Sequence, residues 1–331
     1  MSGYDLFSHR ACLHISCVLA ITCHFLSNDV QAQAYPLRAL RLVVPFSAGG
    51  PADAIARTVA QRLAVGLGQQ VIVDNRVGAN AIIGTEIVAR ALPDGYTLLM
   101  VAFPHAINPS LQAKLPYDTV ADFSPITLAT TGPMLLALHP SVPVNDVRGL
   151  VALARARPGD LTCGSSGTGS TAHLALAMLN HVAGINIAHI AYKGAGQGMT
   201  DLLGGHLAMY FGGVVALLPH VKSGKLKGLA VSTSKRSEAA PAIPTIAETG
   251  VADYEVSGWY GVVAPVRTPV AIVKRLNAEI VSQLQRDDVK ERLAANGAEV
   301  VAGSPEQFAA YIQNEIEKWR KIIKATGIRA D

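Results

Sequence analysis

The chain has 331 residues, about the length of two domains of ordinary size, so it can bury a substantial core. Charged residues make up 16% of the sequence and apolar residues 50%, a balance that excludes a disordered tail or a coiled coil. The formal net charge is +4, and the lysines and arginines are scattered rather than gathered into a basic stripe. This distribution argues against a nucleic-acid binder.

Residues 1–34 have the pattern of an export signal. Arg10 precedes a mostly apolar stretch, residues 11–26, and the segment closes on an Ala-Gln-Ala motif that ends at Ala34. We expect cleavage after Ala34 and a periplasmic location. A membrane anchor fits less well, because the apolar stretch is shorter than the roughly 20 residues that cross a bilayer. A lipoprotein modified at Cys23 is a further alternative, but the residues before Cys23 match a lipidation motif poorly.

Removal of this signal leaves Cys163 as the only cysteine, so no internal disulfide is expected. We interpret Cys163 as an inert thiol in the core. The histidines show no recurrent ligand spacing and no cysteine pair accompanies them, so we expect neither a metal ion nor another cofactor.

From residue 40 onward, short apolar runs alternate with longer amphipathic stretches, which is typical of a parallel sheet covered by helices. A first helix is expected after Pro51, where apolar residues recur every four positions. Two long helices are expected in succession near the C-terminus, one after Pro269 and one after Ser304, which forms a capping-box pattern with Gln307. Strands are expected at residues 40–44, 71–73, 97–101, 188–192, 207–211 and 229–231.

Two glycine-rich turns, residues 45–51 and 163–171, each lie between an expected strand and an expected helix. Backbone N–H groups at the start of a helix carry partial positive charge and bind anions. Either turn alone also fits a plain structural corner. Two of them in one exported chain indicate a cleft that binds an anion.

Three catalytic interpretations of the second turn fail at the residue that carries the chemistry. The dinucleotide-like pattern from Gly167 to Ala172 lacks the acidic residue expected after the next strand, and Ser170 stands where a phosphate loop needs lysine. The turn also lacks the G-x-S-x-G pattern of a nucleophilic serine. The sequence therefore predicts no enzyme and no catalytic residue, with an exported enzyme that acts on an anionic substrate at the same cleft as the alternative.

The chain after residue 34 resembles the exported solute-binding receptors of tripartite tricarboxylate transporters, the Bug family. The motifs that carry the resemblance occur in the family's order, at residues 43–50, 73–76, 93–99, 105–111, 115–118, 165–170, 173–174, 192–194 and 202–205. The resemblance implies an α/β chain with the type II periplasmic-binding-protein fold, in which two lobes enclose a ligand cleft. Residues 35–133 and 259–331 would form lobe 1, and residues 134–258 would form lobe 2.

The same resemblance implies a monomeric receptor that captures a small carboxylate, either a di- or tricarboxylate or an aromatic acid, by closure of the cleft. The receptor would deliver this ligand to the membrane subunits of the transporter. Gly212 stands where the family usually has an aspartate, and the loss of that carboxylate disfavours an amino-acid ligand.

Carried onto this chain, the family's ligand site comprises both glycine turns and segments near them. For Asp53, stabilisation of its own helix N-terminus and contact with the ligand are both open; for His173, packing beneath the loop and donation to the ligand are both open. The expected ligand-binding residues are Phe46, Ser47, Ala48, Gly49, Gly50, Asp53, His105, Ser165, Ser166, Gly167, Thr168, Gly169, Ser170, His173, Tyr192, Lys193, Gly194 and Gly212.

Overall fold

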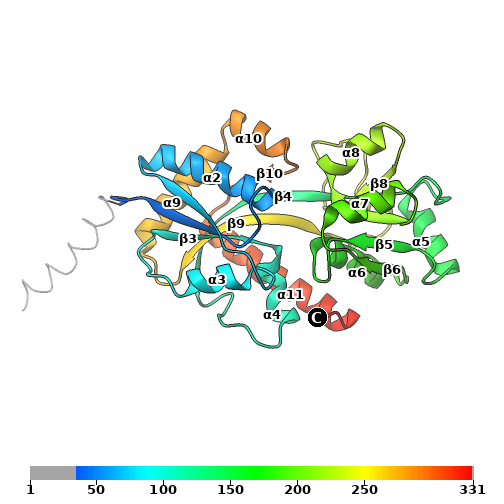
Figure 1. Cartoon of the computed structure of the whole chain (residues 1–331), viewed down its shortest axis with the longest axis horizontal. Helices are drawn as coiled ribbons and strands as arrows, with labels where there is room; N and C mark the ends of the chain where they lie inside the picture. Colours follow the sequence, from blue (N-terminus) through cyan, green and yellow to red (C-terminus); the bar gives the residue numbers. More distant parts are fainter. Residues whose placement is uncertain (1–34, 330–331) are drawn as a thin grey trace, which may run out of the picture.

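The computed structural model describes residues 35–329, so the expected export signal and its cleavage site lie outside the described residues. Two α/β lobes lie side by side, and two long strands pass between them (Figure 1). Within residues 35–329, no helix is both long enough and apolar enough to cross a bilayer.

Lobe 1 begins with three parallel strands, which lie in the order β2-β1-β3. These are β1 (Leu40–Val44), β2 (Val71–Asn75) and β3 (Thr97–Ala102), and they are followed in turn by the helices α2 (Pro51–Leu67), α3 (Ile82–Ala89) and α4 (Phe103–Leu111). Leu, Val and Met side chains dominate β1 and β3 and are buried, as helices on both faces of a sheet require. The strands expected in this lobe and the helix after Pro51 are confirmed.

The two connecting strands are β4 (Phe123–Leu138) and β9 (Ser257–Pro265), which run antiparallel to each other. From Phe123 to Pro133, β4 pairs with β9, and from Met134 onward it pairs with β7 (Met209–Gly213) of lobe 2. The expectation of a parallel sheet is therefore right within each lobe and wrong for the strands that join them. Neither connecting strand was expected from apolar runs, because Pro125, Thr130 and Pro133 interrupt the pattern of β4.

Lobe 2 repeats the strand-and-helix alternation. It contains α5 (Val147–Ala156), β5 (Thr162–Ser165), α6 (Thr171–Ala183), β6 (Ala188–Ala191), α7 (Ala195–Leu203), α8 (Val214–Lys222) and β8 (Lys227–Val231), besides β7. A short 3-10 turn, Ala247–Thr249, precedes the return to lobe 1. β5 pairs in parallel with both β6 and β7, whereas β8 pairs antiparallel with β4. The expected strand at 207–211 begins two residues later than expected, and β5 was missed because its sequence, Thr-Cys-Gly-Ser, contains no apolar run.

The C-terminal segment is more divided than expected. Two long helices are present, α9 (Val270–Leu284) and α11 (Pro305–Thr326), but a short helix, α10 (Asp287–Ala294), and a two-residue strand, β10 (Glu299–Val300), lie between them. The capping box at Ser304 and Gln307 is confirmed at the start of α11. Trp319 of α11 is fully buried and packs edge-on against Phe103 of α4 at 5.0 Å between ring centroids.

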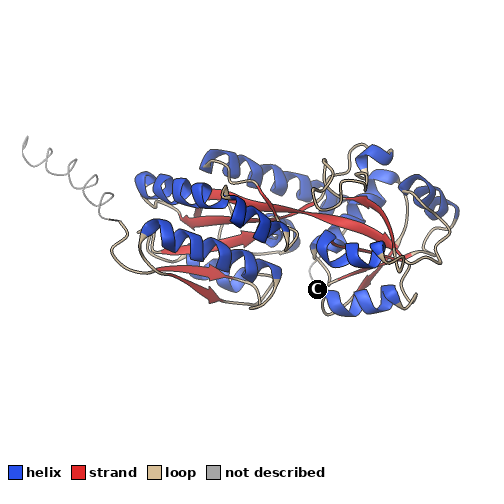
Figure 2. Ribbon diagram, turned by 90° about the horizontal axis from the view of Figure 1, so that it is seen from above, coloured by secondary structure: helices blue, strands red, loops and turns tan. Residues whose placement is uncertain are grey.

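Helix α11 belongs to the packing of both lobes. It contacts α4 and β4 on the side of lobe 1 and α6 on the side of lobe 2. In Figure 1, α11 runs below the strands that join the lobes and ends beside lobe 2, and Figure 2 shows those strands passing from one lobe to the other. The largest apolar cluster accordingly contains residues of both lobes, from Val43 in β1 to Leu179 in α6 and Ile323 in α11.

Candidate functional site

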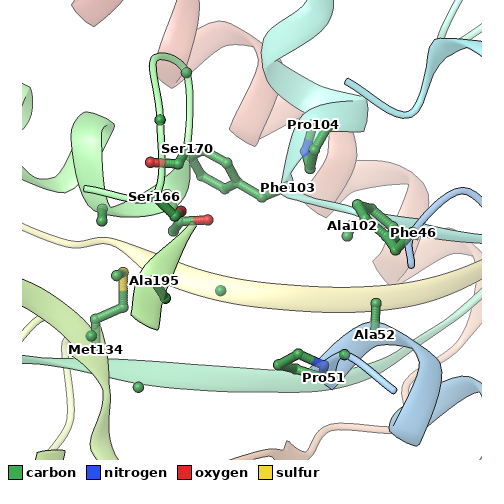
Figure 3. Close-up of a pocket in the computed structure, with 18 of the residues that line it drawn as sticks. Phe46, Pro51, Ala52, Ala102, Phe103, Pro104, Met134, Ser166, Ser170 and Ala195 are labelled. Atoms are coloured by element: carbon green, nitrogen blue, oxygen red, sulfur yellow. The ribbon is translucent and has the colours of Figure 1, made fainter. Parts of the chain in front are cut away.

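A pocket of about 520 Å³ lies between the lobes, at the carboxyl ends of the parallel strands (Figure 3). Lobe 1 contributes the first glycine turn and the start of α4, and lobe 2 contributes the second glycine turn and the segment around β7. The connecting strands β4 and β9 supply Met134, Gly258, Trp259 and Tyr260. Clefts at this edge of α/β sheets are the usual place for a ligand.

Five helices begin at the pocket, each with its first residues or its N-cap in the lining. They are α2 and α4 from lobe 1 and α6, α7 and α8 from lobe 2. The residues that line the pocket include no Asp, Glu, Lys, Arg or His. Because helix N-termini carry partial positive charge, the pocket has a field that favours an anion without any charged side chain in its wall.

Each glycine turn is held by a side chain four residues downstream. In the first turn, the N–H of Gly49 donates to Asp53 Oδ2 at 2.9 Å, and in the second the N–H of Gly169 donates to His173 Nδ1 at 3.1 Å. Both glycines have positive φ, +80° and +75°, a conformation that other residues rarely adopt. Each turn therefore contains a glycine in the left-handed conformation whose N–H donates to a side chain of the helix that follows it.

Asp53 serves the first turn rather than the pocket. Its carboxylate also accepts hydrogen bonds from Arg57 Nε at 2.8 Å and from Asn75 Nδ2 at 3.0 Å, and Asn75 Nδ2 lies 3.0 Å from the carbonyl oxygen of Phe46. Burial alone would raise the pKa of Asp53, but the hydrogen bonds from Arg57, Gly49 and Asn75 hold it at about 2. Of the two interpretations left open for this residue, the contacts favour the structural one.

The second turn rests on a pair of stacked histidines. The rings of His173 in α6 and His189 in β6 are 3.7 Å apart and nearly parallel. Ser165 Oγ lies 2.6 Å from His189 Nε2 and accepts from the N–H of Gly167 at 3.1 Å. Burial, together with the neighbouring His189, lowers the pKa of His173 to about 4. The contacts of His173 favour its interpretation as a support beneath the loop.

Hydroxyl groups are concentrated on the lobe 2 side of the pocket. Ser166, Thr168, Ser170 and Thr171 all belong to the lining, and Ser170 also caps α6 by accepting from the N–H of His173. Tyr210 adds a phenol whose pKa burial raises to about 12, so that it stays protonated and can donate a hydrogen bond. These donors are suited to the oxygens of a carboxylate.

The expected ligand-binding residues divide into two sets. Those that line the pocket are Phe46, Ser47, Gly50, Ser166, Gly167, Thr168, Gly169, Ser170 and Gly212. Those outside the lining are Ala48, Gly49, Asp53, His105, Ser165, His173, Tyr192, Lys193 and Gly194.

The second set lies behind or beside the pocket. His105 is buried in α4 against the ring of Phe123, and neither ring nitrogen has a partner among the described residues. Tyr192 donates its hydroxyl to Asp201 Oδ2 at 2.7 Å, and Lys193 is exposed to solvent. Gly194 caps α7, whose first residue, Ala195, does line the pocket.

Several lining residues were not expected from the sequence. They are Pro51, Ala52, Asn80, Ala102, Phe103, Pro104, Met134, Thr171, Ala172, Ala195, Tyr210, Phe211, Gly213, Gly258, Trp259 and Tyr260. Most of them follow directly from a strand end or begin a helix, so the rule that ligands bind at carboxyl ends of parallel strands would have found them. Trp259 is fully buried, and its Nε1–H has no acceptor among the described residues.

Gly212 and Gly213 differ in how much free space an added side chain would find around them. A Cβ atom added to Gly212 would lie 2.8 Å from Leu217 Cδ1, whereas one added to Gly213 would meet nothing within 4 Å. Gly213 has φ −57° and ψ 137° as the N-cap of α8, a conformation open to any residue. Gly213 belongs to the pocket lining, so a side chain at this position would lie beside the pocket and would fit without strain.

Comparison with known proteins places the chain in a family. Residues 55–328 match the model of the tripartite tricarboxylate transporter family receptor, TctC. Protein BugT of Bordetella pertussis is 38% identical over 306 residues, which cover 92% of this chain and 94% of that protein.

Solved structures of other proteins are similar to this chain both in sequence and in fold. Rpa4515 of R. palustris, solved with adipate, is 36% identical with a TM-score of 0.77 and covers 89% of this chain and 99% of its own. MatC from Rhodopseudomonas palustris, solved with bound malate, is 31% identical with a TM-score of 0.73, with coverage of 87% and 100%. The two-lobed periplasmic-binding-protein fold expected from the sequence is confirmed. The chain therefore belongs to the family of tripartite tricarboxylate transporter receptors, as its motifs predicted.

Proposed function

We propose that this protein is a periplasmic receptor that captures a small carboxylate between its lobes and delivers it to the membrane subunits of a tripartite tricarboxylate transporter. The observation that carries the proposal is the uncharged pocket at which five helices begin. Membership of the receptor family supports it, as do relatives solved with adipate and with malate.

Capture without a charged partner has a physical advantage. A buried lysine or arginine would have to lose its hydration and would be costly whenever the pocket stood empty. Hydroxyls and backbone N–H groups are neutral, yet each hydrogen bond to a carboxylate is stronger than one between neutral groups. Ordered water can bridge any donor that does not reach the ligand directly. The pocket is therefore suited to reversible binding.

We propose that closure occurs about the connecting strands, with residues 35–133 and 259–331 as lobe 1 and residues 134–258 as lobe 2. The change of partner in β4 between Pro133 and Met134 supports this division, and β9 enters lobe 1 at Gly258 and Trp259. A ligand drives closure only by the contacts that it makes in the closed state and lacks in the open one. Since the two lobes line opposite sides of one pocket, a single carboxylate ligand can provide such contacts.

We also propose that the protein returns its ligand unchanged, acts as a monomer and reaches the periplasm by cleavage after Ala34. The hydroxyls of Ser166 and Ser170 lack the arrangement of a nucleophile: the His173 ring faces Gly169, and Ser170 Oγ caps its own helix. A catalytic serine would need a base within hydrogen-bond reach and a hydroxyl open to the pocket; Ser165 Oγ lies 2.6 Å from His189 Nε2 but is buried outside the pocket lining.

Calorimetric titration of residues 35–331 with adipate, malate and benzoate tests the proposal. We expect at least one of them to bind with one-to-one stoichiometry, and mass spectrometry after incubation to recover that carboxylate intact. Failure of all three to bind at millimolar concentration would contradict the receptor function. Appearance of a product would instead support the exported enzyme.

A further inference from the structure

The two sides of the pocket differ in chemistry. The lobe 2 side presents the hydroxyls of Ser166 and Ser170, and the opposite side presents Phe46 and Ala52 beside the start of α4 (Figure 3). Thr168 and Thr171 add further hydroxyls on the lobe 2 side, whereas apolar residues line both sides of the pocket. On lobe 1 the apolar lining is Phe46, Pro51, Ala52, Ala102, Phe103 and Pro104, and the other contributors are Ser47, Gly50, Asn80, Trp259 and Tyr260.

The helix starts of lobe 1 offer a carboxylate fewer backbone N–H donors than those of lobe 2 do. Pro51 is the first residue of α2 and Pro104 the second residue of α4, so neither position has an N–H to offer. Asp53 in the first turn of α2 offsets the positive end of that helix, and the N–H of Gly49 is already donated to it. Asn80 donates its side-chain amide to Asn108 Oδ1 at 2.8 Å.

Lobe 2 has the opposite character. The first two residues of α6 are Thr171 and Ala172, which keep their N–H groups, and no acidic residue lies in the first turn of α6, α7 or α8. Four hydroxyls surround the start of α6. A carboxylate is therefore bound better by lobe 2 than by lobe 1.

From this asymmetry we infer that the ligand is a carboxylate with an apolar body, of the arylcarboxylate class, whose carboxylate faces the Ser166–Ser170 turn and whose ring faces the apolar wall of lobe 1. The inference rests on the proposed function. Aromatic side chains at Phe46, Phe103 and Tyr260 offer favourable contacts to a ring. A hydroxyl or second carboxylate placed against Phe46, Ala52 and Ala102 would lose its water without gaining a partner.

The experiment compares benzoate with malate, citrate and quinate by calorimetry. Quinate is the matched probe, because it is a ring carboxylate of similar size that carries hydroxyls. We expect benzoate to bind at least tenfold more tightly than each of the other three. Equal or tighter binding of any of them would overturn the inference and leave the receptor function standing. If none of the four and no adipate binds, the proposed function itself fails.

Two variants of one position make the test specific to lobe 1. Phe46→Gln places an amide in the apolar wall, and Phe46→Leu keeps the wall apolar as the matched control. We expect the Gln variant to lose at least tenfold in affinity for benzoate and the Leu variant to lose less than threefold. Equal affinities in the two folded variants would show that the ring of the ligand does not face Phe46, and would overturn the assigned orientation.

Discussion

Some side chains at this site are available to the ligand, whereas others hold the loops in place. Ser166 lies in the lining, is exposed, and has no hydrogen bond to another described residue, so its hydroxyl is available to a ligand. Asp53 and His173, by contrast, accept hydrogen bonds from the backbone N–H groups of the glycine turns. The distinction between residues that contact the ligand and residues that hold the loop is therefore visible in their hydrogen bonds.

Ser166→Ala tests the first task. A hydrogen bond to a charged group contributes roughly 1.5–3 kcal/mol, so the variant should bind its carboxylate about 10- to 150-fold more weakly. Calorimetry measures the change. Ser282→Ala, at an exposed position of α9 outside the pocket, is the control and should bind as the wild type does. Unchanged affinity in Ser166→Ala would remove the second turn from the ligand site.

His173 gives the protein a pH dependence of stability. Its folded pKa of about 4 lies below the ordinary value of 6.5, because burial and His189 disfavour the charged form. The unfolded chain then binds more protons between these two values, so stability is complete above pH 6.5 and is lost as the pH falls toward 4. One such histidine contributes at most about 1.4 kcal/mol per pH unit.

We therefore expect the free energy of unfolding in urea to fall from pH 6.5 to pH 5 in the wild type, with a smaller slope in His173→Asn. His181→Asn, at an exposed position near the end of the same helix, should keep the wild-type slope. A wild-type stability that is flat over this range would contradict the account of the histidine pair.

At the scale of elements, the contact between β9 and α11 fixes the connecting strands against the helix that spans both lobes. A Cβ atom at Gly261 of β9 would lie 2.1 Å from Phe308 Cζ of α11. Gly261→Ala should therefore destabilise the fold by about 1–3 kcal/mol in urea unfolding, since the helix must move away. Gly258→Ala in the same strand meets only the carbonyl oxygen of Gly132 at 3.5 Å and should be nearly neutral for stability. Equal losses in the two variants would contradict this packing.

Elements with strong local signals were predictable, and elements defined by partners far away in sequence were not. Pro51 and the capping box at Ser304 indicate where α2 and α11 begin, because these signals act within one helical turn. Strand β4 carries no such signal. Its hydrogen-bond partners come from residues 209–213, 227–231 and 257–265, so its extended form is imposed by tertiary pairing.

The same limit applies to the site. The glycine turns were recognised in the sequence, but Met134 and Trp259 reach the pocket only because β4 and β9 pass between the lobes. His105 shows the converse: it lies within a family motif, yet the fold buries it outside the pocket lining. Sequence patterns located the turns, whereas the surrounding wall follows from how the lobes are joined.

At the scale of the whole molecule, the helix starts at the pocket create a field that holds a carboxylate there, and those of lobe 2 contribute most because Asp53 offsets the positive end of α2. The N-cap of α8 offers a direct test, because a side chain at Gly213 meets no atom within 4 Å. Gly213→Asp adds a negative charge to the pocket, and Gly213→Asn adds a neutral side chain of the same shape. Both residues are good N-caps, so neither variant should melt at a lower temperature than the wild type.

The decisive measurement is calorimetric titration of both variants with benzoate and with adipate. Two charges about 6 Å apart at an effective dielectric constant of about 20–40 repel by about 1.4–3 kcal/mol, so Gly213→Asp should bind about 10- to 100-fold more weakly than Gly213→Asn. Gly213→Asn should remain within about threefold of the wild type for each carboxylate that the wild type binds. Equal affinity in the Asp and Asn variants would contradict the claim that the pocket between the lobes holds a carboxylate by its electrostatic field.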